Sequence, residues 1–101
     1  FTFSEVTDLG SYRKDDSYLQ KHIDAILALD LVDVEAIKKR DFKIVVDGIN
    51  SVGSFAVPAM LEALGVQEIV VINGEANGHF AHNPEPLPQN LATVSNAVKR
   101  E

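Results

Sequence analysis

The chain has 101 residues, 46% of them hydrophobic and 24% charged, which is enough for one modest globular core and too short for two. Its 15 acidic and 9 basic residues give a formal net charge of -6 without a basic stripe, and this balance argues against binding to nucleic acid. The absence of cysteine excludes disulfides and thiolate metal sites. No apolar run has the length of a membrane span, and none has the pattern of a signal peptide. We therefore expect a cytoplasmic protein that contacts no membrane.

The N-terminal part of the chain predicts an arm followed by two helices. Residues 1–15 alternate apolar and polar side chains only briefly, which is a weak strand or arm signal. A helix is expected from a capping position at Asp16 or Ser17, and its apolar residues recur at helical spacing at Leu19, Ile23, Ile26, Leu27 and Leu31. Asp33 has the position of an N-cap for a second helix over residues 34–40, with acids early and bases late. We assign residues 1–41 to an arm and helical linker segment.

The middle of the chain predicts a strand, a helix and a second strand. Residues 42–47 and 68–73 are short β-branched runs, as expected for parallel neighbours in a right-handed βαβ unit. Residues 54–64 between them have helical character and end at Gly65, a residue favoured in a left-handed C-cap. Pro58 requires either that regular hydrogen bonding begins close to it or that the first turn is irregular. The apolar residues of this helix are expected to pack against the sheet: Phe55, Val57, Met60, Leu61 and Leu64.

A long polar loop over residues 74–91 follows the second strand. Pro84, Pro86 and Pro88 fix the backbone at alternating positions within it, and a loop of this length is uncommon without a function. Asn90 is placed to cap a last helix, whose apolar residues share one face and whose bases lie at the end.

These elements predict an α/β fold in which a βαβ unit with flanking helices forms part of a three-layer α/β/α domain with a mixed or parallel sheet. Two strands that are apolar on both faces do not make a stable sheet, and a strand-helix-strand-helix order predicts another strand. We therefore expect residues 42–101 to be a domain that is incomplete at its C-terminus. A domain that lacks strands would have exposed strand edges. Because such an edge can pair with a strand of another chain, the fragment could form homo-oligomers.

Two local patterns near the strand ends suggest ligands but have simpler interpretations. Residues 48–54 contain two glycines at the separation found in a phosphate loop, yet the lysine of a nucleotide P-loop is missing, so turn formation is favoured over anion binding at the following helix. His79 and His82, with Glu75 and Glu85 nearby, offer possible metal donors. Spacing along a loop imposes no shared face, and hydrogen-bonded loop histidines are the alternative.

Several motifs in one order along residues 42–101 resemble the second domain of the α-D-phosphohexomutase family, of the phosphomannomutase/phosphoglucomutase type. They are Val46-Asp-Gly-Ile-Asn-Ser-Val-Gly-Ser54, Leu64-Gly-Val-Gln-Glu-Ile-Val-Val-Ile-Asn-Gly74, Asn77-Gly-His-Phe80 and Asn83-Pro-Glu-Pro-Leu-Pro-Gln-Asn-Leu91. Residues 81–84, Ala-His-Asn-Pro, are similar to the Ser-His-Asn-Pro of the family's first domain. Alanine stands in the serine position, so we expect no phosphorylated nucleophile here.

The resemblance implies a four-domain, Mg²⁺-dependent isomerase that moves phosphate between the 1- and 6-positions of a hexose phosphate through a phosphoserine and a bisphosphorylated sugar. In this family the phosphoserine, the magnesium loop, the sugar-reading loop and the phosphate clamp would lie outside this chain, with the magnesium loop just beyond Glu101. We therefore expect no catalytic or metal-binding residue in the chain. Its partners would be the other domains of the same polypeptide, and the isolated chain would be inactive.

Four polar residues are candidates for the rim of the active site that the resemblance implies. In open α/β sheets, sites form beyond the carboxyl ends of the strands, and residues 48–54 and 74–90 follow such ends. Asp47, Asn50, Ser51 and Asn83 could support a metal site there through hydrogen bonds. The alternative is that Asp47 and Asn50 only stabilise a turn.

A second functional hypothesis belongs to a different class. The chain could be a self-contained α/β binding or oligomerisation module in which the loop over residues 74–90 recognises a partner.

Overall fold

The computed structural model describes residues 1–101 and contains the helices and strands in the expected order. The helices are α1 (Tyr18–Leu27), α2 (Val34–Lys39), α3 (Gly53–Ala63) and α4 (Ala92–Arg100), the strands are β1 (Lys43–Asp47) and β2 (Glu68–Ile72), and the short 3-10 helices are η1 (Val6–Asp8) and η2 (Pro88–Asn90). None of the helices is both long enough and apolar enough to cross a membrane.

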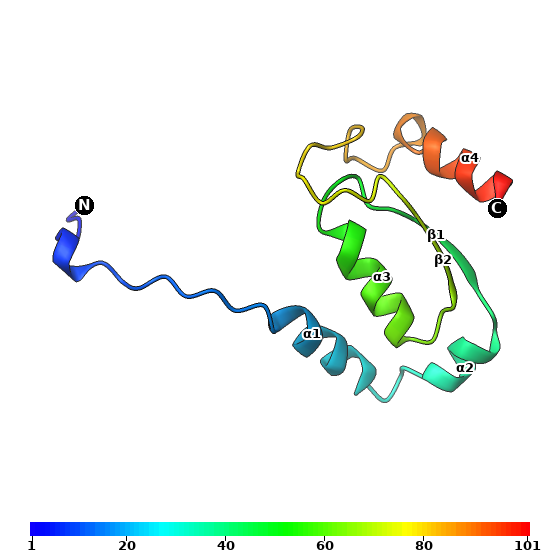
Figure 1. Cartoon of the computed structure of the whole chain (residues 1–101), viewed down its shortest axis with the longest axis horizontal. Coiled ribbons are helices and arrows are strands. Elements are labelled where there is room, and N and C mark those ends of the chain that lie inside the picture. Colours follow the sequence, from blue (N-terminus) through cyan, green and yellow to red (C-terminus); the bar gives the residue numbers. More distant parts are fainter.

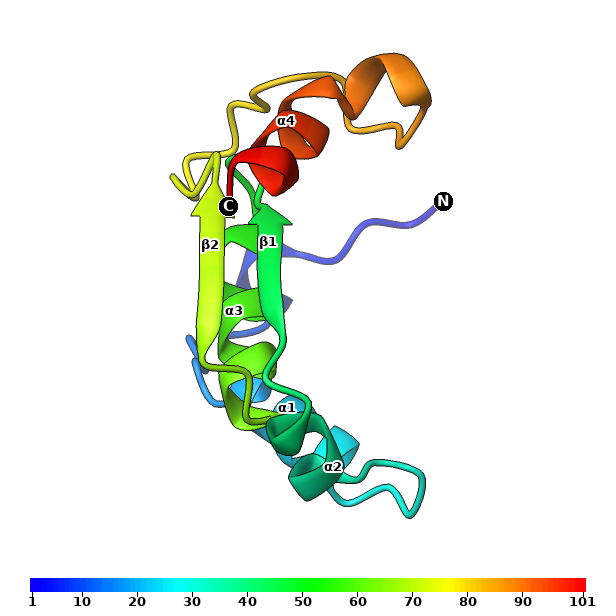
Figure 2. The same cartoon turned by 90° about the vertical axis from the view of Figure 1, so that its right-hand side faces the viewer.

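The two strands are parallel neighbours, as predicted. Ile44 pairs with Ile69 and Val46 with Val71 in a register without a bulge. The connection through α3 is right-handed, the hand that nearly all such crossovers adopt (Figure 2). The sheet consists of these two strands alone, so each strand leaves its other edge without a strand partner.

Helices cover both faces of the sheet. In Figure 2, α3 lies behind the strands and α4 lies in front, across β1 at its carboxyl end. Helix α1 packs against α3 and forms an outer element on that side (Figure 1). The arrangement is therefore an α/β/α sandwich built on a narrow sheet, which confirms the predicted fold class.

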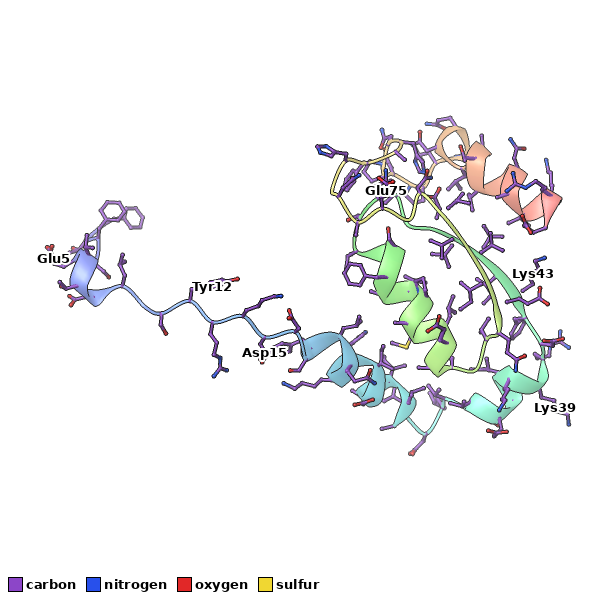
Figure 3. All side chains as sticks on the ribbon, viewed as in Figure 1. Glu5, Tyr12, Asp15, Lys39, Lys43 and Glu75 are labelled. Carbon is purple, nitrogen blue, oxygen red and sulfur yellow. The ribbon has the colours of Figure 1, made fainter.

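The core is small and spread over several elements. The buried hydrophobic side chains are Ile23 on α1, Val46 on β1, Val66 after α3 and Ala97 on α4. The radius of gyration is 18.5 Å, against about 13 Å for a compact domain of similar length. The difference comes from the N-terminal arm, which runs away from the sheet with Tyr12 along it (Figures 1 and 3).

Of the two alternatives for residues 1–15, a strand or an arm, the structure shows an extended arm. It contains the single turn η1 and no strand, and its large side chains Phe1, Phe3 and Tyr12 are exposed. A strand needs a hydrogen-bonding neighbour, and neither β1 nor β2 pairs with this segment.

Helix α3 ends as the sequence predicts and begins with an irregular turn. Gly65 has φ +88°, and Val66 N–H donates to Leu61 O at 3.0 Å, which is the C-terminal motif that favours glycine. At the other end, the Ser54 amide bonds three residues back to Ser51 O at 2.9 Å, so the first turn is tighter than α-helical. Of the two accommodations expected for Pro58, the irregular first turn is the one observed.

Of the five apolar residues assigned to the sheet-facing side of α3, Phe55 lies elsewhere, and Val57, seven residues before Leu64 and on the same side as Leu64, is incompletely covered. Phe55 is 51% exposed and Val57 43% exposed, whereas Met60, Leu61 and Leu64 are half-buried. At 3.6 residues per turn, Phe55 lies on the opposite side of the helix from Leu64. A sheet of two strands is also too narrow to cover the flanks of the helix that packs on it.

Two predicted helix caps are wrong and one is confirmed. Asp33 accepts a hydrogen bond from Ala36 N–H at 2.9 Å and caps α2. Ser17 makes no side-chain cap, and α1 ends at Leu27, so Leu31 lies outside the helix and is 98% exposed. Asn90 does not cap α4 either, because the N-cap position is Leu91 and no side chain caps this helix. The Asn90 side-chain amide instead donates to Glu85 O at 2.8 Å within the preceding loop.

Candidate functional site

Polar side chains gather where the carboxyl ends of β1 and β2 meet two loops. The β1–α3 loop comprises residues 48–52, and the proline loop comprises residues 73–91. Figure 1 shows both loops at the same end of the sheet, and Figure 3 shows Glu75 among the side chains that crowd there. In parallel α/β sheets this is the edge at which ligand sites form.

Asp47 is the centre of this edge. Its Oδ1 accepts hydrogen bonds from Ile49 N–H at 3.1 Å and from Asn73 Nδ2 at 2.9 Å, and its Oδ2 lies 2.9 Å from His82 Nε2. The Asp47 side chain is 14% exposed and that of His82 is 25% exposed. One carboxylate thus joins β1, the end of β2 and the proline loop.

The Asp47–His82 pair shifts the pKa of both partners toward the charged forms. Burial raises the pKa of Asp47, but hydrogen bonds from Asn73, His82 and Ile49 together outweigh it and hold that pKa below its ordinary value. The hydrogen bond to Asp47, followed by the one to the Asn83 carbonyl, raises the pKa of His82 above its ordinary value. The pair is therefore an ion pair over the pH range between the two pKa values.

Asn50 ties the two loops together through backbone and side chain. Its N–H donates to Asn73 O at 2.8 Å, its carbonyl accepts from Gly78 N–H at 2.8 Å, and its Nδ2 donates to His79 O at 3.1 Å. Ile49 and Asn50 both have left-handed backbones, with φ of 47° and 56°. This conformation is unfavourable for a β-branched residue such as Ile49, so the surrounding hydrogen bonds hold it in place.

Gly48 is required by the close approach of the two loops. A Cβ atom at this position would lie 2.8 Å from Ser54 Cα and 2.9 Å from Asn73 O. The Ser54 hydroxyl lies near the same carbonyls, 3.4 Å from Gly48 O and 3.3 Å from Asn73 O. The backbone of the β1–α3 loop therefore packs directly on the end of β2.

The structure brings three of the four candidate residues into one network. Asp47 and Asn50 belong to it directly, and Asn83 contributes its carbonyl oxygen, which lies 2.8 Å from His82 Nδ1. The Asn83 side chain turns to Glu85 N–H at 3.0 Å. Ser51 bonds through its backbone alone, accepting from Ser54 N–H and donating to Gly48 O. The turn-stabilising role proposed for Asp47 is observed in its bond to Ile49.

The sequence interpretation missed Asn73 and the pairing of His82 with Asp47. Asn73 follows the last residue of β2, and the register pairs Ile72 with Asp47, so its position beside Asp47 could have been derived from the parallel alignment of the two strands. No sequence pattern identifies the partner of His82, because a histidine within an irregular loop has no periodicity that fixes its direction.

The histidine and glutamate side chains of the proline loop do not form a metal site. No group of three His, Asp or Glu side chains lies close enough together to hold a metal ion. Glu75 instead accepts a hydrogen bond from Asn77 Nδ2 at 3.2 Å, and His82 is held by Asp47 and Asn83. The alternative of a hydrogen-bonded loop histidine is the one observed for His82.

Comparison with known proteins identifies relatives over most of the chain. Residues 20–101 match the family described as "Phosphoglucomutase/phosphomannomutase, alpha/beta/alpha domain II". A phosphoglucomutase/phosphomannomutase of Thermococcus kodakarensis is 43% identical over 93 residues, which are 91% of this chain and 20% of the relative. A phosphoglucosamine/phosphogalactosamine mutase of Sulfurisphaera tokodaii is 35% identical over 88 residues, 86% of this chain and 19% of the relative. The chain thus spans about a fifth of the length of these curated relatives.

Proposed function

The chain belongs to the phosphoglucomutase/phosphomannomutase family as its alpha/beta/alpha domain II, and on this premise we propose that it acts as the second domain of a longer, magnesium-dependent phosphohexomutase. The reaction would interconvert hexose 1-phosphate and hexose 6-phosphate through a phosphoserine enzyme. The observation that carries this proposal is the match over residues 20–101 to relatives whose names are those of phosphomutases and which are about five times longer.

The topology supports a position for the active site beside β1. Helix α4 lies on the face opposite α3 and crosses over β1. A right-handed crossover from β2 through α4 would bring a following parallel strand to the free edge of β1. The β1–α3 loop would then leave the sheet on one face, and the loop after the neighbouring strand would leave it on the opposite face. A crevice would open between these two loops, at the place where α/β sheets bind ligands. The magnesium loop would enter this crevice.

The chain would supply the rim of the site and no ligand to the metal. Asp47 already accepts three hydrogen-bonding groups, and no cluster of carboxylates stands beside it, so the residues present do not fit a Mg²⁺ centre of their own. Bound Mg²⁺ would neutralise phosphate charge from outside these residues. We assign Asp47, Asn50, Ser51 and Asn83 to the rim, where Asp47 and Asn50 bond to the proline loop and hold the two loops together.

Holding the loops is a useful contribution to phosphoryl transfer, because positioning and charge neutralisation lower most of the barrier in such reactions. The left-handed turn at Ile49 and Asn50 fixes the β1–α3 loop, and the bonds of Asn50 to the proline loop make the two loops move as one unit. Ala81, without a hydroxyl, cannot carry the phosphoryl group, so the nucleophile would come from another domain.

The substrate would be a hexose phosphate, the partners would be the other domains of the same polypeptide, and the location would be the cytoplasm. The self-contained binding module is the competing hypothesis, and it predicts no phosphomutase activity in any length of the protein.

The test is a phosphomutase assay with Mg²⁺, a hexose 1-phosphate and its bisphosphate activator, performed on the 101-residue chain and on the full-length gene product. We expect activity in the full-length product alone. Glucose, mannose and glucosamine phosphates are assayed separately, so that sugar preference is not mistaken for inactivity. Full-length protein that is folded and inactive with all three sugars would overturn the proposal.

A further inference from the structure

We propose that the imidazolium of His82 is a protonation-controlled clasp that holds the proline loop against the carboxyl end of β1, and that this loop opens when His82 loses its proton. The clasp is a property of the chain itself. Only its effect on catalysis rests on the proposed phosphomutase function.

Both ring nitrogens of His82 face hydrogen-bond acceptors. Nε2 lies 2.9 Å from Asp47 Oδ2 and Nδ1 lies 2.8 Å from the carbonyl oxygen of Asn83. Both neighbours are acceptors with no proton to give, since Asp47 is ionised in this arrangement and a carbonyl has none. Both contacts are hydrogen bonds only if both ring nitrogens carry a proton, which defines the imidazolium.

A neutral ring can satisfy only one of these contacts. If its single proton is on Nε2, the lone pair of Nδ1 faces the Asn83 carbonyl, and if the proton is on Nδ1, the lone pair of Nε2 faces the Asp47 carboxylate. Either tautomer places two acceptors within 3 Å of each other. Loss of the proton therefore converts one attraction of the clasp into a repulsion.

The clasp is the only hydrogen bond between the distal part of the proline loop and the sheet. Within residues 80–91, the other hydrogen bonds of the loop are internal, such as Glu85 N–H to Asn83 Oδ1 and Asn90 Nδ2 to Glu85 O. The next anchor toward the N-terminus is the Asn50 bond to His79, and the next toward the C-terminus is the packing of α4 on β1. Release of His82 thus frees a segment of loop between two fixed ends.

Asp47 is the charged group beside the His82 ring, and it therefore governs the protonation of the ring. From β1 the ring faces the Asp47 carboxylate, which in turn is held by the neutral amide of Asn73 at the end of β2. From α3 the polar group at this edge is the neutral Ser54 hydroxyl, which stays with backbone carbonyls. From the proline loop the ring faces the Asn83 carbonyl. The raised pKa of His82 agrees with this arrangement and keeps the clasp closed at mildly acidic pH.

The test is hydrogen exchange of the full-length gene product, measured by mass spectrometry between pH 5.5 and 8.5 on peptides covering residues 78–91 and corrected for intrinsic exchange. We expect protection to fall as the pH rises through the His82 titration. A difference of one pKa unit between the closed and open loop corresponds to about a tenfold change in protection. In His82→Gln, protection should be low and independent of pH, because glutamine does not titrate.

The matched control is His79→Gln. His79 lies in the same loop and takes part through its backbone carbonyl, so this variant should keep the wild-type pH profile. Protection that is independent of pH in the wild type, or a profile that His79→Gln removes and His82→Gln keeps, would overturn the proposal. Should His82→Gln not fold, Asp47→Asn must still flatten the profile. Exchange needs no catalysis, so an inactive protein with the expected profile refutes the mutase proposal and leaves the clasp standing.

Discussion

The side-chain amide of Asn73 donates a 2.9 Å hydrogen bond to Asp47 Oδ1 and thereby joins the ends of the two parallel strands. The two residues are 26 positions apart in the chain, and α3 lies between them. Asp47 also accepts hydrogen bonds from Ile49 N–H and from the His82 ring, so the Asn73 amide is one of three donors to this carboxylate. Together these hydrogen bonds offset the free energy that a mostly buried carboxylate loses when it leaves water.

Asn73→Ala removes one donor from a partly buried carboxylate. We expect the free energy of unfolding of the full-length gene product to fall by about 1.5 to 3 kcal/mol, as for the loss of a hydrogen bond to a charged group. Asn96→Ala is the control, because Asn96 is exposed on α4 and makes no side-chain hydrogen bond, so its replacement should leave stability unchanged or slightly higher. Urea denaturation followed by far-UV circular dichroism measures both. Equal effects of the two variants would refute the role given to Asn73.

Asp47 should also make the stability depend on pH at the acid end. Its pKa is lower in the folded chain than in the unfolded chain, so the unfolded state binds more protons near pH 4 and stability rises with pH there. This contribution is complete above the unfolded value of about 3.9 and is lost as the pH falls through the folded pKa. Asp47→Asn should remove this part of the profile and lower stability at pH 7.

The control for Asp47→Asn is Asp30→Asn, at an exposed carboxylate without a hydrogen-bond partner. Denaturation midpoints from pH 2.5 to 7 are compared for the wild type and both variants. The curve of Asp30→Asn should run parallel to that of the wild type, while that of Asp47→Asn should be flatter below pH 4. Parallel curves for all three proteins would show that Asp47 is not specifically stabilised as a carboxylate.

The sequence was sufficient to predict the order and type of the regular elements but not the network at their ends. Strands β1 and β2 and helix α3 are encoded by local periodicity and by Gly65, so they could be located within a residue or two. The partners of Asp47 come from 26 and 35 residues away, and nothing local encodes those distances. Asp47 was identified because it ends a strand, whereas the direction of the His82 ring depends on a loop that Asn50 holds in place.

Gly48→Ala should disrupt the contact between the β1–α3 loop and the end of β2. The added Cβ would lie within 3 Å of backbone atoms of Ser54 and Asn73, and backbone cannot move aside as a side chain can. We expect a loss of about 1 to 3 kcal/mol, the usual cost of overpacking. Gly53→Ala, five residues on, is the matched control, since its Cβ would meet only Gly48 backbone atoms at 3.7 Å or more.

Gly53 lies at the start of α3, where alanine is a better helix former than glycine, so Gly53→Ala should leave stability equal or raise it by up to about 1 kcal/mol. Thermal denaturation of both variants gives the sign of each effect directly. A Gly48→Ala protein as stable as the wild type would mean that the two loops are not in close contact.

The 101-residue chain in isolation should associate with itself. Each strand has a free edge, only four hydrophobic side chains are buried, and the exposed large apolar residues include Phe42, Val52, Phe55 and Phe80. An unpaired edge beside exposed apolar surface is a template for pairing with another copy. Sedimentation velocity at increasing protein concentration should therefore show a rising mass for the chain and a constant mass for the full-length gene product.

In the longer protein, further strands and domains would cover the same surfaces. A monomeric chain that unfolds in one cooperative transition would contradict this expectation and favour the self-contained module, because such behaviour requires that the two-stranded sheet be stable on its own.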